Sequence, residues 1–231
     1  MDIILIPGLW LDANSWDPVL PALEQAGHRT HPLTMPGVGL PASESSQTGI
    51  SDWVDAVVAR IDEIAGKVIL VGHSGGGNVA WGAADSRPDR VARVVLVDTI
   101  LPYPGASISE FEVVDGVVPF PGWEFFDEED VADLDGPTRE RASALARSVP
   151  AHVPTDPIVL SDERRFDVPV TVLSGQMDQE TLVAAMSGWG RYGSEAASVG
   201  DFRVVRIGTG HWPQLSAPER LAALLLAAVT G

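Results

Sequence analysis

A short run, Gly72-His73-Ser74-Gly75-Gly76, follows directly after the apolar stretch 68–71. That stretch is rich in β-branched residues, which is typical of a strand buried on both faces of a sheet. Small residues then continue from 78 to 84 and predict a helix. A serine between a strand and a helix, with glycines that allow close packing, has the pattern of a nucleophile elbow, whose strained turn exposes the hydroxyl. A glycine-rich loop without chemistry is the alternative interpretation.

A serine hydroxyl needs a base and an acid to become a good nucleophile, and the chain offers candidates for both. His211 stands in a glycine-rich loop after the strand-like run 202–207 and before a helix with a proline near its start. Asp178 stands in the turn that follows the strand-like run 170–173. The order along the chain is therefore serine, aspartate, histidine, which matches one of the known arrangements of a catalytic triad.

Two other residues compete for these roles. Asp98, at the end of the strand-like run 91–97, is a rival for the acid, and Asp178 could instead be the N-cap of the helix that begins at residue 179. His73 is the histidine nearest to Ser74 in sequence, but the residue before an elbow serine is expected to point beneath the sheet. We therefore predict a structural role for His73.

With these motifs, the chain resembles the α/β-hydrolase fold superfamily, in particular its small serine esterases and lactonases. The resemblance extends over nearly all 231 residues. It includes the opening segment 3–10, which is similar to the oxyanion strand and loop of that family, with Pro7 where a histidine is usual. The fold implied by the resemblance is a mostly parallel central sheet with helices on both faces.

The resemblance also implies site roles for individual residues. The backbone N–H groups of Leu9 and Gly75 are expected to bind the oxyanion, the second of them at the start of a helix whose dipole favours negative charge. Asp178 is favoured over Asp98 as the acid, because an aspartate in the turn after the later strand is the commoner arrangement in the family.

Strand-like and helix-like runs alternate along the chain, which independently predicts an α/β fold with right-handed crossovers. The predicted strands are residues 3–6, 28–33, 68–71, 91–97, 170–173 and 202–207. The predicted helices are residues 15–26, 51–65, 76–86, 179–189 and 213–229. We expect one domain over residues 1–231.

Residues 101–167 interrupt the alternation and are rich in proline and aromatic residues. The segment resembles the lid or cap that family members insert after the sixth family strand, over the serine. Within it, 137–147 could form a short helix with proline in its first turn, and the acidic run 127–130 is expected to be a solvated face. Three tryptophans are candidates for the wall of a substrate pocket, with core packing as the alternative for each: Trp10, Trp123 and Trp212.

Composition excludes several classes of function. The net charge of −17, with Lys67 as the only lysine, argues against nucleic acids and anionic membranes as partners. The chain has no cysteine, and the spacing of its five histidines fits no metal motif, so we predict neither a metal nor another cofactor. The N-terminus lacks the features of a signal peptide, and no apolar stretch is long enough to span a bilayer. We expect a cytoplasmic protein that acts on a small molecule.

The sequence thus predicts a serine hydrolase that cleaves a small-to-medium carboxylic ester or lactone, uncharged or apolar, through an acyl-enzyme. Ser74 is the predicted nucleophile, His211 the base and Asp178 the acid. A hydrolase of C–C bonds or of thioesters with the same triad is an alternative. A small-molecule binding protein built on a hydrolase scaffold is another.

Overall fold

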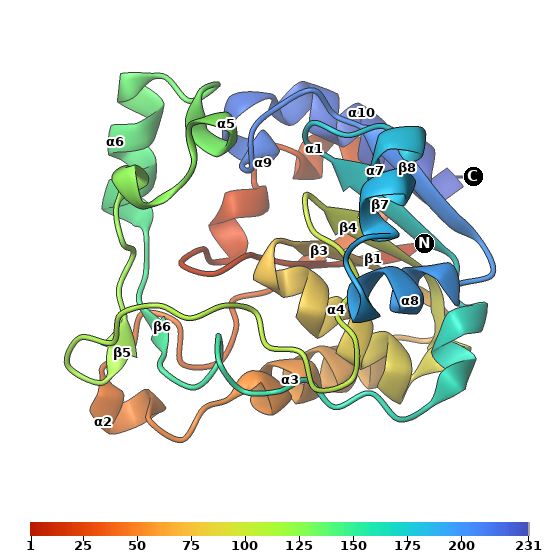
Figure 1. The fold of residues 1–231 in the computed structure, drawn as a ribbon, viewed down its shortest axis with the longest axis horizontal. Helices are drawn as coiled ribbons and strands as arrows, with labels where there is room; N and C mark the ends of the chain where they lie inside the picture. Colours follow the sequence, from red (N-terminus) through yellow and green to blue (C-terminus); the bar gives the residue numbers. More distant parts are fainter. Residues whose placement is uncertain (231) are drawn as a thin grey trace.

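The computed structural model describes residues 1–230 and contains a six-stranded sheet with helices on both faces (Figure 1). Every neighbouring pair of strands in this sheet is parallel. In spatial order, the strands are β2 (Arg29–Pro32), β1 (Asp2–Ile6), β3 (Val68–His73), β4 (Val91–Val97), β7 (Val170–Ser174) and β8 (Phe202–Arg206). The predicted α/β fold is confirmed, and each predicted strand overlaps one of these six.

The helices follow the prediction less closely. Two predicted helices are each split in two: 15–26 into the 3-10 turn η1 (Ala13–Trp16) and α1 (Leu20–Gln25), and 213–229 into α9 (Pro213–Ser216) and α10 (Pro218–Thr230). Pro18 and Pro218 lie at the two breaks, where a missing N–H and a ring clash stop a helix from continuing. The remaining elements outside residues 101–160 are α2 (Ala42–Ser45), α3 (Ile50–Glu63), α4 (Gly75–Ser86), η2 (Pro88–Arg90), η4 (Glu163–Asp167), α7 (Gln179–Met186) and α8 (Arg191–Ala197).

The first strand shows how the sheet is buried on both faces. Ile4 and Ile6 belong to the core that includes side chains of α3 and α4, whereas Ile3 and Leu5 belong to the core that includes side chains of α1 and α10. Successive side chains of a strand point to opposite faces, so a strand covered on both sides is apolar at every position. All four side chains are fully buried.

Glycines allow α4 to approach the sheet where β3 ends. A Cβ atom on Gly72 would lie 2.5 Å from the carbonyl oxygen of Gly76, and one on Gly76 would collide with the carbonyl oxygens of Ile6 and Pro7. Any larger residue at these two positions would push the helix away from β1 and β3. The close approach fixes Ser74, between the two glycines, at the carboxyl end of the central strand.

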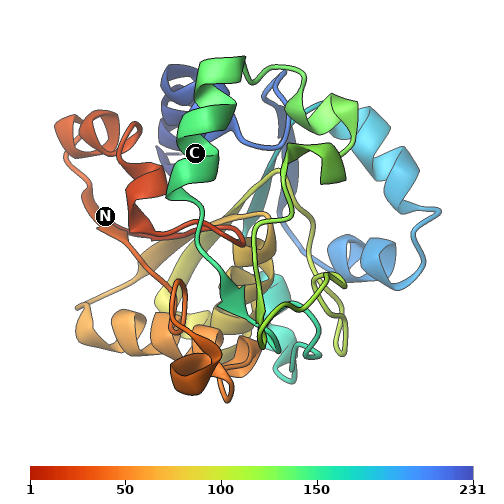
Figure 2. The ribbon, with the colours of Figure 1, turned by 90° about the vertical axis from the view of Figure 1, so that its left-hand side faces the viewer.

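Within residues 101–167, much of 101–150 forms a layer beside the sheet, green in Figure 1 and facing the viewer in Figure 2, whereas η4 at the end of the segment packs against α4. Hydrogen bonds from Arg147 N to Trp10 O and from Gly39 N to Ser148 O join this layer to the loops that follow β1 and β2. A helix occupies much of the predicted range 137–147, with proline in its first turn as expected. The segment contains β5 (Val117–Val118), η3 (Trp123–Phe125), α5 (Glu128–Val131), α6 (Gly136–Leu145) and β6 (Val149–Pro150). Its interpretation as a lid stays a prediction.

None of the helices within residues 1–230 has both the length and the apolar character needed to cross a bilayer.

A buried ionic network joins α4 to η4 and α8. The guanidinium of Arg165 donates to Glu195 Oε1 at 2.8 Å and to Asp85 Oδ1 at 3.2 Å, and all three side chains are at most 6% exposed. The indole of Trp81 donates to the same Glu195 oxygen at 2.9 Å. Because both carboxylates are desolvated, each depends on the arginine for compensation of its charge.

We predict that Arg165→Met lowers the free energy of unfolding by about 3–5 kcal/mol, because it leaves two buried carboxylates without a counter-charge. The neighbouring Arg164 is the matched control: it pairs with Asp89 and Asp162 on the surface. Arg164→Met should cost much less, because ion pairs on the surface contribute little to stability. Urea unfolding of both variants measures the difference, and equal losses would contradict the prediction.

Candidate active site

Ser74 has the strained backbone that the elbow pattern predicts. Its φ is 51° and its ψ is −127°, a conformation that L-residues rarely adopt. Hydrogen bonds from Ser74 N to Val97 O and from Gly77 N to Ser74 O hold the turn. Trp10 and Asp98 also have positive φ values, of 63° and 48°. Three of the four non-glycine residues with positive φ within residues 1–230 therefore lie around one site, as is common where strain serves function.

His211 is held by Asp98. The imidazole Nδ1 of His211, in the loop between β8 and α9, lies 2.7 Å from Asp98 Oδ2. The other carboxylate oxygen of Asp98 accepts a hydrogen bond from Gly175 N, also at 2.7 Å. Burial opposes ionisation of Asp98, but the bonds from His211 and Gly175 outweigh it and lower its pKa. The carboxylate therefore fixes Nδ1 as the protonated nitrogen and leaves Nε2 as the basic one.

The expected pairing of Asp178 with His211 is not the arrangement in the structure. Asp178 is exposed and caps α7, accepting a hydrogen bond from Thr181 N at 2.9 Å, and this bond lowers its pKa. The physical reason is the turn after β7: its first residue, Gly175, binds Asp98 through its N–H, and the chain then leads away into the helix. The rival acid Asp98 and the capping alternative for Asp178 are the interpretations that agree with the geometry.

His73 points beneath the sheet edge and supports the histidine loop from below. Its Nε2 lies 2.7 Å from the carbonyl oxygen of His211, which only accepts, so Nε2 carries the proton. Its Nδ1 then accepts from the Gln214 amide at 3.2 Å. Burial and the neighbouring His211 lower the pKa of His73 to about 3, which keeps the ring neutral. The geometry agrees with the structural role that we predicted.

The acidic run 127–130 is not entirely the solvated face that we expected. Its last residue, Asp130, is half-buried and accepts a hydrogen bond from His211 N through its backbone carbonyl at 2.8 Å. Burial raises the pKa of the Asp130 carboxyl, and the nearby His211 only partly opposes this. Asp133 accepts from Gly210 N at 2.8 Å. The α5 region therefore holds the backbone of the histidine loop.

Asp98, Asp130 and His211 offer ligand atoms within 4.8 Å of one another, the one such cluster among residues 1–230. These donor types suit a divalent cation. However, the hydrogen bond between His211 and Asp98 already uses the Nδ1 atom, so the cluster needs no ion to explain it.

Two backbone N–H groups adjoin Ser74. The N–H of Leu9 makes no hydrogen bond within residues 1–230, and that of Gly75 is at the first position of α4, where a helix leaves its N–H groups unpaired. The two residues are neighbours, since a Cβ on Gly75 would lie 3.2 Å from Leu9 Cγ. Their arrangement can bind a negatively charged oxygen, which keeps Leu9 and Gly75 as our candidates for an oxyanion hole.

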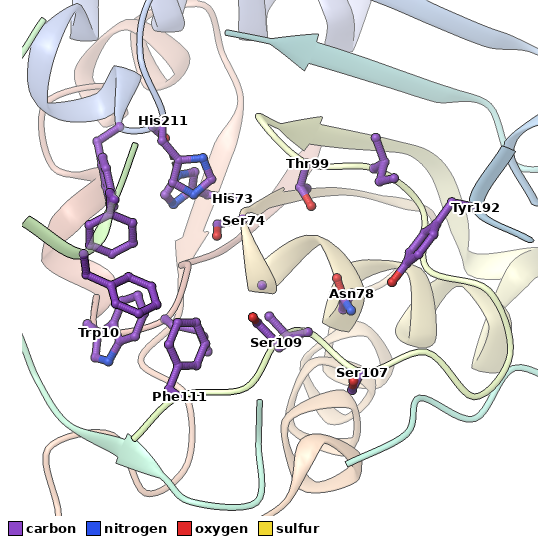
Figure 3. A pocket seen from close by; sticks show the side chains of 17 residues that line it. Trp10, His73, Ser74, Asn78, Thr99, Ser107, Ser109, Phe111, Tyr192 and His211 are labelled. Carbon is purple, nitrogen blue, oxygen red and sulfur yellow. Dashed lines mark hydrogen bonds between the residues drawn. The ribbon is translucent and has the colours of Figure 1, made fainter. Parts of the chain in front are cut away.

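A cavity of about 370 Å³ opens over Ser74 and His211 (Figure 3). Of the three candidate tryptophans, Trp10 and Trp212 line this cavity, whereas Trp123 is not among its lining residues. Trp123 lies behind the wall, with its ring centroid 5.1 Å from that of Trp212 and its indole bonded to Arg139 O and Ser143 Oγ.

The cavity has two chemically different ends. We define the aromatic wall as Trp10, Phe111, Phe125, Phe126 and Trp212. We define the polar end as the five polar side chains Asn78, Thr99, Ser107, Ser109 and Tyr192, although the neighbouring Ile100 and Ile108 also line the cavity. In Figure 3, Trp10 and Phe111 lie to the left of and below Ser74, Thr99, Asn78 and Tyr192 lie to its right, and Ser109 lies between them beside Phe111. None of the polar end was predicted from sequence, although Asn78 stands one helical turn after Ser74 and this spacing alone places both on one face of a helix.

The sequence profile of the alpha/beta hydrolase family matches residues 3–224, nearly the whole chain. The chain belongs to the alpha/beta hydrolase family. Solved structures share its fold: an extracellular alpha/beta-hydrolase from a Paenibacillus species has a TM-score of 0.78 at 22% identity, covering 99% of this chain and 98% of its own. A methylesterase from Arabidopsis has a TM-score of 0.75 at 20% identity, covering 100% and 99%.

Curated relatives are similar to part of the chain. A pyrethroid hydrolase of Sphingobium wenxiniae is 34% identical over 115 residues, which is 48% of this chain and 40% of that protein. A carbendazim hydrolyzing esterase of a Nocardioides species is 34% identical over 113 residues, 46% of this chain and 45% of that protein. The chain thus spans less than half the length of these relatives.

We predict that His73 makes this family member less stable in mild acid. Its folded-state pKa is about 3 and its ordinary value is 6.5, so between these values the unfolded chain binds more protons. The free energy of unfolding therefore falls as pH is lowered from about 6.5 towards 3, with His73 contributing up to about 1.4 kcal/mol per pH unit.

Urea unfolding at pH 6.5 and 4.5 tests this. His73→Gln should show a smaller loss over that interval than the wild type, because one titrating group is gone. His152→Gln is the control, since that side chain is 61% exposed, and its loss should equal that of the wild type. An unchanged loss in His73→Gln would show that the ring titrates normally in the folded state.

Proposed function

We propose that this protein hydrolyses a small-to-medium, neutral carboxylic ester or lactone through an acyl-enzyme. The observation that carries the proposal is the convergence of two groups on one cavity: the strained Ser74 and a His211 whose Nδ1 is bound by Asp98. A serine, a histidine and an orienting carboxylate in this relation are the machinery of acyl transfer.

In the proposed mechanism, Ser74 Oγ attacks the carbonyl carbon while His211 Nε2 takes its proton. The Asp98 carboxylate keeps Nδ1–H directed at itself and stabilises the imidazolium that forms. The N–H groups of Leu9 and Gly75 receive the oxyanion. His211 then protonates the departing alkoxide, and a water molecule that it deprotonates releases the acyl group from Ser74.

The lining of the cavity supports a neutral substrate. Apart from two histidines, none of its 17 lining residues carries an ionisable acid or base of the Asp, Glu, Lys or Arg type. An ionised group on the substrate would lose hydration on entry without gaining a counter-charge. A volume of about 370 Å³ is at the small end of ligand pockets, which supports a substrate of modest size.

The relatives favour the same chemistry. Those found by sequence include a pyrethroid hydrolase, a carbendazim hydrolyzing esterase and a methylesterase of Arabidopsis thaliana. Their names share hydrolysis, mostly of esters, while their substrates differ. We therefore carry over the reaction class and take the substrate from the cavity itself.

We predict that Ser74→Ala removes nearly all activity on p-nitrophenyl esters, by roughly 10⁴-fold or more in kcat, because triad members act as a unit. The variant should also lose labelling by a fluorophosphonate probe, which reacts with an activated serine. Ser46→Ala, at an exposed serine, should retain both properties. A folded Ser74→Ala that keeps a tenth of wild-type activity would overturn the mechanism.

We predict that Asp98→Asn and Asp178→Asn have opposite outcomes. The first places an amide N–H against Nδ1 and so favours the wrong tautomer of His211, a change that can cost about 10⁴-fold in kcat. The second replaces one good N-cap by another and should leave kcat and the melting temperature almost unchanged.

Measuring kcat and melting temperature for both variants decides between the two acids. If Asp98→Asn is well folded and fully active while Asp178→Asn is inactive, then Asp178 and not Asp98 is the acid of the triad.

A further inference from the structure

The polar end of the cavity has hydrogen-bonding capacity that the protein does not use. Asn78 is 7% exposed, yet its side-chain amide has no hydrogen-bond partner within residues 1–230 and faces the cavity. Its amide atoms are not sealed within the protein but reach the cavity, where water or a substrate group can bind them. The other buried positions of α4 up to Ala84 are glycines and apolar side chains, apart from the indole of Trp81, which is bonded to Glu195.

Three neighbouring hydroxyl groups, all on partly exposed residues, add further hydrogen-bonding capacity. The hydroxyls of Thr99, Ser107 and Tyr192 also line the cavity and make no hydrogen bond among the described residues. Burial raises the pKa of Tyr192, so its hydroxyl stays protonated and able to donate at neutral pH. These groups come from four separate segments of the chain: α4, the loop after β4, the start of the segment 101–167, and α8.

We propose that the polar end binds a neutral hydrogen-bonding group of the substrate, a hydroxyl or a carbonyl, while the aromatic wall holds an apolar or aromatic group on the other side of the ester. The proposal deepens the proposed function and rests on it. Hydroxyls and amides both donate and accept, so they suit a neutral polar group of either kind. No cation lines this end, so a carboxylate is not matched.

The position of Asn78 also sets how far the polar group of the substrate lies from its ester carbonyl carbon. Asn78 is the fourth residue of α4, which begins directly after Ser74, so it lies about one helical turn, or about 5 Å, from the end of the helix next to Ser74. The polar group is therefore about five bonds from the carbonyl carbon that Ser74 attacks. An alkyl group at this position would displace water from Asn78 and Tyr192 and leave both unpaired, which is the basis for discrimination.

Two matched pairs of esters test the proposal. One compares 3-hydroxypropyl benzoate with butyl benzoate, and the other compares phenyl 5-oxohexanoate with phenyl 5-methylhexanoate. The polar group lies on the alkoxy side in the first pair and on the acyl side in the second, and each ester has an aromatic ring for the opposite wall. We expect kcat/KM to favour the polar member by at least about tenfold in one pair.

Tyr192→Phe should reduce that preference by about three- to tenfold, because it removes one hydrogen bond and keeps the ring packed on Tyr103, whose centroid is 4.7 Å away. Tyr103→Phe is the matched control: Tyr103 is not among the residues that line the cavity, and its loss of a hydroxyl should leave the preference intact. Asn78→Leu should bring the ratio of kcat/KM between the polar and the apolar ester close to one. The melting temperature of this variant shows whether it folds. If Asn78→Leu does not fold, the result with Tyr192→Phe decides the question alone.

The outcomes separate this inference from the function on which it rests. Equal kcat/KM within both pairs, or a preference that survives both Tyr192→Phe and Asn78→Leu, overturns the polar subsite while ester hydrolysis stands. Failure of the wild type to hydrolyse any of the four esters or to react with the fluorophosphonate probe overturns both.

Discussion

The close contact between α4 and the strands β1 and β3 is the constraint on which the site depends. Gly72 and Gly76 permit that contact, since a Cβ at either position would meet backbone atoms. The chain must then turn from strand to helix within a residue, and Ser74 takes the strained conformation that this requires. Packing of a large, fully buried core on both faces of the sheet maintains the strain.

The same contact organises the groups that surround Ser74. It brings the start of α4, with its unpaired N–H groups, against the loop that follows β1, so that Leu9 and Gly75 become neighbours. It also places His73 directly under the histidine loop, where its ring bonds to the carbonyl of His211. The position of His211 is thus set from three sides: by Asp98 at the ring, by His73 at the carbonyl and by Asp130 at the N–H.

Sequence patterns predict the parts of this protein that local physics determines. The six strands and the Ser74 elbow follow from short apolar runs and from glycine spacing, and the positions of Pro18 and Pro218 explain the two helices that were predicted too long. The choice between Asp98 and Asp178 is different. Both follow strands that end at the same edge of the sheet, and the decision depends on how the turn after β7 uses Gly175 N. Such a contact between distant segments has no signature in a single sequence.

Many of the residues that line the cavity are also not predictable from the sequence. Its polar end draws one or two residues from each of four segments, so no stretch of sequence contains a recognisable pattern, and an isolated Asn78 in a helix of small residues is not distinctive. Only the assembled fold shows that these side chains share one space and make no side-chain hydrogen bonds within residues 1–230. The net charge of −17 lies elsewhere on the molecule, since no acidic residue lines the cavity. The recognition that we propose therefore depends on neutral dipoles and aromatic faces, whose effect is short-ranged and requires direct contact with the substrate.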